Sequence, residues 1–220
     1  MSQTPYPPFT PDGGPRYVET HWEWFIKEPF NATTAFLFAA IAIYWLYRLR
    51  GQWRKNDFLV GCLVVLLVGG IGGTLFHGLR VSRYFLIMDV LPIFLIAVAL
   101  AVRLWRFLLP AIWAPPAVLV SFVGIQWGLH QMVPRSTAIN AGYAMTALMI
   151  ILPLLLVLRK RPEGAKQVFL AIGLFAVGLF FRAVDGFSEP YISIGTHWLW
   201  HLFSAASVWF LISFLARFRP

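Results

Sequence analysis

Long apolar stretches separated by short polar segments make up most of the chain. Seven stretches can be marked, at residues 31–47, 58–76, 84–102, 112–129, 141–158, 168–181 and 197–215. Most of them approach the ~20 residues that an α-helix needs to cross the hydrocarbon core of a bilayer. The alternation of apolar and polar positions that a membrane-spanning barrel requires is absent from the sequence. The pattern therefore predicts an all-α integral membrane bundle of seven transmembrane helices.

No linker, internal repeat or low-complexity tract divides the seven stretches. We therefore expect one transmembrane domain at residues 30–220, preceded by an outer N-terminal segment at residues 1–29. Residues 1–16 are rich in proline, glycine and polar side chains and lack the basic start and apolar core of a signal peptide. The first spanning helix is therefore expected to direct insertion. The fourth stretch fits the pattern least well, because prolines 110, 115 and 116 crowd its start.

The composition supports a membrane protein. Hydrophobic residues make up 59% of the chain and charged residues only 12%, whereas soluble domains carry roughly 25% charged residues. The formal net charge of +9 raises the question of nucleic-acid binding, but the basic residues are spread over several loops without a shared stripe. Membrane topology explains them better, and we expect no nucleic-acid partner. The single cysteine, Cys62, excludes a disulfide within the chain.

The distribution of basic residues chooses between the two orientations of a seven-helix bundle. With the N-terminus outside, the cytoplasmic segments contain twelve Lys and Arg residues, namely Arg48, Arg50, Arg54, Lys55, Arg103, Arg106, Arg159, Lys160, Arg161, Lys166, Arg217 and Arg219. The outer segments contain six, namely Arg16, Lys27, Arg80, Arg83, Arg135 and Arg182. Because basic residues concentrate in cytoplasmic loops, this bias predicts an outer N-terminus and a cytoplasmic C-terminus. Without a eukaryotic targeting signal, we expect a bacterial inner membrane.

Four ionisable residues interrupt or border the apolar stretches. His197 and His201 lie four residues apart, which places both imidazoles on one face of a helix, one turn apart. With the predicted orientation, His77 and Asp89 fall in the same outer half of the bundle. Ionisable groups at membrane depth are costly and are by default functional hypotheses. Interfacial histidines bonded to water, headgroups or backbone carbonyls, and a packing role for Asp89, remain the plain alternatives.

Three histidines and a nearby carboxylate are the residue types of a catalytic zinc site. Three imidazoles plus water form the usual coordination of a catalytic zinc. Such a metal activates water and polarises a carbonyl, as the hydrolysis of an amide or ester requires. A nearby carboxylate such as Asp89 can accept the proton of the water or orient a ligand histidine.

Several short motifs resemble those of one protein family. These are Gly73-Thr-Leu-Phe-His77, then Leu-Ile-Met-Asp89-Val-Leu-Pro-Ile, then His197-x3-His201, with Glu28-Pro-Phe-Asn31 and Phe181-Arg-Ala-Val-Asp185 before the first and last helices. In order and position they resemble the alkaline ceramidases, part of the CREST group of seven-helix membrane hydrolases and receptors. The resemblance covers most of the chain.

The resemblance implies a zinc-dependent membrane hydrolase that cleaves the amide bond of ceramide or a similar N-acyl lipid. It implies that His77, His197 and His201 are the zinc ligands and that Asp89 is the acid–base residue. A non-enzymatic seven-helix receptor or scaffold, in which the metal only braces the helices, is the alternative function. A transporter fits less well, because no pair of interrupted helices occurs in matching halves of the chain.

Two departures from the family pattern affect the expected site. Where the family has a serine thought to assist at the reacting carbonyl, four residues before the histidine of the second helix, this chain has Gly73. Thr74 is therefore a candidate catalytic residue, and Ser204 is a weaker one. Animal ceramidases also have an acidic calcium-binding segment before the first helix.

Glu19 and Glu28 are accordingly candidate calcium ligands, although Arg16 lies where another acid is expected and a hard cation needs six to eight oxygen ligands. Arg182 and Asp185 are close enough in sequence for an ion pair that supports the last helix.

Overall fold

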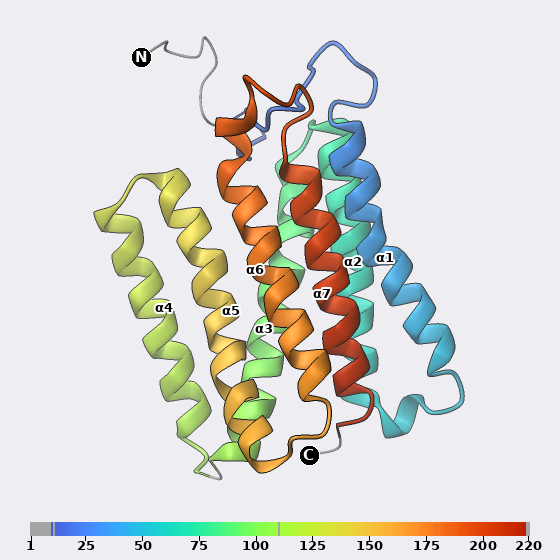
Figure 1. Cartoon of the computed structure of the whole chain (residues 1–220), viewed down its shortest axis with the longest axis vertical. Helices are drawn as coiled ribbons and strands as arrows, with labels where there is room; N and C mark the ends of the chain where they lie inside the picture. The colour runs from blue at the N-terminus through green and yellow to red at the C-terminus, as the bar shows by residue number, and fades with distance from the viewer. Residues whose placement is uncertain (1–9, 11, 110, 219–220) are drawn as a thin grey trace.

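The structure, a computed structural model, describes residue 10, residues 12–109 and residues 111–218. Seven long helices in these residues form one bundle (Figure 1), and no strand occurs among them. The helices are α1 (Pro29–Arg48), α2 (Asp57–Leu79), α3 (Arg83–Leu108), α4 (Ala114–Met132), α5 (Arg135–Lys160), α6 (Ala165–Ser188) and α7 (His197–Leu215), with a short 3₁₀ turn, η1 (Trp53–Lys55). The predicted all-α membrane bundle of seven helices is confirmed.

Six of the seven described helices, all except α4, are long and apolar enough to cross a membrane. Helix α4 begins with two prolines and carries Gln126, His130 and Gln131 near its end, which explains its weaker apolar character. Helix α6 differs most from the prediction, because it continues past residue 181 to Ser188. The last two turns of α6 therefore carry Arg182 and Asp185.

The helices that carry the candidate ligands are joined through α1. Helix α2 packs against α1 and α3, and α7 packs against α1 and α6. Two glycines let α2 approach its neighbours closely. A Cβ at Gly70 would lie 2.3 Å from the backbone nitrogen of Ala39, and one at Gly72 would lie 2.4 Å from the Cβ of Met88. Glycine removes these clashes, so α1, α2 and α3 pack backbone to backbone.

The N-terminal cover, residues 12–28, closes one end of the bundle, at the top of Figure 1. Arg80 at the end of α2 donates from Nε to Asp12 at 2.7 Å, and the amide of Val18 donates to Asp185 of α6 at 3.2 Å. Helix α7 begins at this end and finishes at the opposite end (Figure 1).

The largest apolar cluster lies towards the far end, where α3, α5 and α7 finish and α6 begins. It includes Leu100, Leu104, Val157, Val168 and Phe214. Polar residues and apolar core are thus separated along the bundle.

Candidate metal centre

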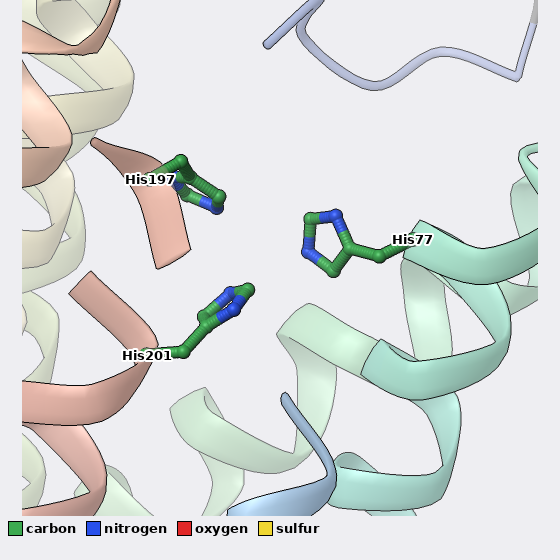
Figure 2. Close-up of side chains that lie close together, drawn as sticks. All are labelled: His77, His197 and His201. Carbon is green, nitrogen blue, oxygen red and sulfur yellow. The ribbon is translucent and has the colours of Figure 1, made fainter. Parts of the chain in front are cut away.

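Three histidines from two helices meet beneath the N-terminal cover. His77 comes from the last turn of α2, and His197 and His201 come from the first turns of α7. Figure 2 shows the three rings turned towards one another. All three side chains are buried, and one nitrogen from each lies within 4.8 Å of the others. The structure therefore brings together the three residues that the sequence singled out.

Hydrogen bonds fix the tautomers of two of these rings. Nδ1 of His77 lies 2.5 Å from a carboxylate oxygen of Glu28, and Nδ1 of His201 lies 3.1 Å from the backbone carbonyl oxygen of Asn31. A carboxylate and a carbonyl only accept hydrogen bonds, so each Nδ1 must carry the proton. Nε2 of each ring is then left with a free lone pair. Metal-binding histidines are commonly oriented by such a bond to their second nitrogen.

Two ring nitrogens of the histidines are buried without a hydrogen-bond partner, as expected of atoms that bind a metal. Among the described residues, Nε2 of His77 and Nδ1 of His197 are buried and have no hydrogen-bond partner. Leaving a buried polar atom unpaired costs about 1–3 kcal/mol, and a bound cation would remove that cost. A tetrahedral zinc, with bonds of about 2.0–2.1 Å, requires nitrogens roughly 3.3 Å apart. The ring nitrogens of the three histidines lie within 4.8 Å of one another, so small rotations of the rings would bring them to that distance.

The group of three histidines can thus hold a metal ion. Imidazole ligands suit zinc, copper, iron and nickel.

A buried network of charged residues contacts Nδ1 of His77, the nitrogen that carries the proton. Glu28 accepts hydrogen bonds from His77, from Nη1 of Arg80 and from the hydroxyl of Thr20, the last at 2.7 Å. Arg80 also binds Asp12. Burial by itself would raise the pKa of Glu28, but the hydrogen bond from His77 and the charge of Arg80 hold that pKa below its ordinary value. Glu28 is therefore an anion that orients His77.

The two candidate calcium ligands have protein partners instead. Both oxygens of Glu28 are taken by the network above, and its neutralising charge comes from Arg80. Glu19 accepts hydrogen bonds from the amides of Phe30 and Asn31, the second at 2.9 Å, and so caps the start of α1. Neither carboxylate contributes to the only candidate metal group among the described residues. The contacts of these two carboxylates therefore do not support a calcium site.

Asp185 fixes the start of α7 and so the position of His197. It accepts hydrogen bonds from the amides of Thr196, at 2.7 Å, and His197, at 2.9 Å. The expected ion pair between Asp185 and Arg182 is not formed in the described part of the chain. The guanidinium of Arg182 lies instead over the ring of Tyr143, 4.4 Å from its centre. The amides at the start of α7 bind Asp185 because a helix N-terminus leaves its first N–H groups unpaired.

The candidate acid–base residue and its neighbours lie beside the histidines. A Cβ added at Gly73 would lie 2.6 Å from Oδ1 of Asp89, so the Asp89 carboxylate fills the space over this glycine. Asp89 is also close enough to His77 for their charges to interact. The hydroxyl of Thr74 donates to the carbonyl of Gly70 within α2, at 2.7 Å. The hydroxyl of Ser204 lies against Gly178 of α6, 3.1 Å from the position that a Cβ would take there.

A largely apolar pocket of about 750 Å³ opens beside the metal centre, between α3, α5, α6 and the N-terminal cover. Its apolar lining includes Leu86, Val90, Leu91, Phe94 and Ile139, and its polar lining is formed by Tyr17, Arg83, Asp89, Tyr143 and Arg182. The sequence did not single out Tyr17, because it lies in an irregular segment that no helical period connects to the histidines.

The chain was compared with models of protein families and with curated proteins, and neither comparison found a match.

Proposed function

We propose that this protein is a zinc-dependent membrane hydrolase that cleaves the amide bond of ceramide or a similar N-acyl lipid. The observation that carries the proposal is a group of three buried, inward-facing imidazoles next to a largely apolar pocket, whose lining includes the Asp89 carboxylate and the Tyr17 ring that stacks on His197. The resemblance of the motifs around His77, Asp89 and His197 to alkaline ceramidases supports the same reaction. The lipid would enter sideways between helices, with its acyl chain against the apolar wall.

Some residues of the chain orient the metal-binding histidines, and Asp89 transfers a proton. Glu28 and the carbonyl of Asn31 hold His77 and His201 with their Nε2 lone pairs free for the cation. Zinc, when bound by the three histidines, would supply Lewis acidity and activate water near neutral pH. Asp89 accepts a proton from the attacking water and returns it to the departing nitrogen. A carbon–oxygen bond forms at the carbonyl as the carbon–nitrogen bond breaks, which yields a fatty acid and an amine.

Lipid hydrolysis by the purified, zinc-loaded protein tests this function. Mass spectrometry should detect a fatty acid and a sphingoid base, or a similar amine, from an N-acyl lipid. Asp89→Asn should reduce turnover by about 10²–10⁴-fold, the typical contribution of a positioned base, while it retains zinc. Asp57→Asn, at the exposed start of α2, is the matched control and should retain full activity. A zinc-replete wild type that releases no product from any N-acyl lipid would refute the hydrolase.

The alternative is a receptor or scaffold in which the metal braces α2 against α7. It is favoured by the same observation, because His77 and His197 lie on different helices. In that case Asp89→Asn would change nothing, and His197→Ala would chiefly lower the thermal stability. We further propose an outer N-terminus in a bacterial inner membrane, which places the metal centre on the outer side. Labelling of single cysteines introduced in the N-terminal cover would test this orientation.

A further inference from the structure

Tyr17 is one side chain that contacts both the metal centre and the pocket. Its ring stacks on His197, with 3.8 Å between ring centres and an angle of 21° between the planes. It also lies 5.3 Å from the ring centre of His77. On its other side it lines the pocket together with Asp89 and Arg182. No sequence motif pointed to Tyr17, yet it lies between the histidines and the pocket.

The backbone around Tyr17 is anchored on both sides. The amide of Tyr17 donates to the hydroxyl of Thr20 at 3.2 Å, and Thr20 in turn donates to Glu28. The next residue, Val18, donates its amide to Asp185, which also caps the start of α7. The ring is therefore held by the same residues that position His77 and His197. Such support is what keeps a catalytic group within a fraction of an ångström of its working position.

The hydroxyl of Tyr17 is suited to donate a hydrogen bond into the pocket. Arg182 is close enough for its charge to act on this hydroxyl. Arginine has only donors, so the phenol oxygen can accept from it and keep its own proton for another acceptor. The structure gives that proton no protein acceptor among the residues it describes. A carbonyl oxygen of a bound lipid would supply one.

The other candidate hydroxyls have different surroundings. A Cβ added at Gly73 would lie 2.6 Å from Oδ1 of Asp89, so a serine there would displace this carboxylate. The Thr74 hydroxyl donates to the backbone carbonyl of Gly70 within α2, and the Ser204 hydroxyl lies against Gly178 of α6. Tyr17 of the N-terminal cover is therefore the candidate for the role that a serine on the second helix has in the family pattern.

We propose that Tyr17 is a catalytic residue whose hydroxyl donates a hydrogen bond to the carbonyl oxygen of the lipid amide and to the oxyanion that forms from it. This inference rests on the proposed hydrolase and deepens it by naming the group that stabilises the reacting oxygen. Such stabilisation is effective because the donor is already oriented when negative charge develops. Tyr17 forms no covalent bond and transfers no proton in this role.

Kinetics of Tyr17→Phe provide the first test. Phenylalanine keeps the ring that stacks on His197 and removes only the donor. We expect kcat to fall by about 10²–10³-fold with little change in KM, as on loss of one oxyanion donor. Zinc content and melting temperature should match the wild type. Tyr191→Phe, an exposed tyrosine between α6 and α7, is the control and should behave as wild type. A Tyr17→Phe variant with unchanged kcat would overturn the inference.

Binding to the metal-free, full-length protein provides a second test that does not depend on turnover. Two neutral probes are compared, an N-acyl lipid and its analogue with an (E)-alkene in place of the amide. Wild type should prefer the amide, and Tyr17→Phe should reduce that preference by about 2–10-fold, the value of one hydrogen bond. An equal preference in both proteins, or no binding of either lipid to wild type, would overturn the role of Tyr17. A carbonyl-dependent preference without hydrolysis by zinc-loaded wild type would instead refute the hydrolase and leave Tyr17 as the carbonyl donor.

Discussion

At the scale of single residues, Glu19 is a buried carboxylate whose ionisation affects folding. Its exposed fraction is 2%, and its oxygens cap α1. Burial raises its pKa from the ordinary 4.5 to about 7, although hydrogen bonds from the amides of Phe30 and Asn31 act in the opposite direction. The folded state therefore binds this proton more tightly than the unfolded state does. The contribution of Glu19 to stability is full below about pH 4.5 and is lost as the pH rises through about 7.

We predict that Glu19→Gln, which stays neutral and keeps an acceptor oxygen, removes this pH dependence. The melting temperature of zinc-loaded wild type should fall relative to that of the variant between pH 5 and pH 8. Thermal melts across that range measure the difference. Glu23→Gln, at an exposed neighbouring position, should follow the wild-type curve. Parallel curves for wild type and Glu19→Gln would contradict the raised pKa.

At the scale of elements, the packing of α2 against α3 sets the distance between His77 and Asp89. Gly72 allows this packing, because any Cβ there would lie 2.5 Å from the backbone carbon of Met88, the residue before Asp89. A backbone atom cannot rotate away as a flexible side chain can, so the two helices would have to move apart.

Gly72→Ala should therefore lower the free energy of unfolding by about 1–3 kcal/mol and reduce lipid hydrolysis. Gly61→Ala is a matched control on the same helix, since nothing lies within 4 Å of its added Cβ. That control should be neutral, or more stable by about 0.5–1 kcal/mol, because alanine favours a helix over glycine. Equal effects of the two substitutions, measured by denaturation in detergent, would rule out close packing at Gly72.

At the scale of the whole molecule, a metal bound between α2 and α7 should stabilise the entire bundle. A ligand that binds only the folded state adds about 4 kcal/mol when its concentration is 1,000 times its Kd. Chelation should therefore lower the melting temperature, and added zinc should restore it. His201→Ala should abolish this response, whereas His130→Ala, on the exposed surface of α4, should retain it. A zinc response that survives in His201→Ala would place the ion elsewhere.

The apolar stretches and the spacing of the histidines were enough to predict the fold and the group of three histidines that could hold a metal ion. Transmembrane helices depend on hydropathy over about 20 neighbouring residues, which is a local property. The pair His197 and His201 is equally local, because helical geometry alone puts residues four apart on one face. His77 could be added because it ends a neighbouring helix on the same predicted side. The sixth apolar stretch was marked to residue 181 and was too short to span unless it extended to Arg182 or beyond, as α6 does. Polar residues in the last turns of α6 interrupt the hydropathy signal on which the marked end relied.

Tertiary structure alone decided which residues surround those histidines. The sequence suggested Glu28 as a calcium ligand, but the approach of Arg80 turned it into the anion that orients His77. Asp185 became the cap of α7, and Tyr17 reached His197 from the irregular N-terminal cover. These contacts join residues far apart in the chain, and their partners depend on how the helices pack. Hydropathy and helical period describe neighbours along a segment and therefore carry no information about such contacts.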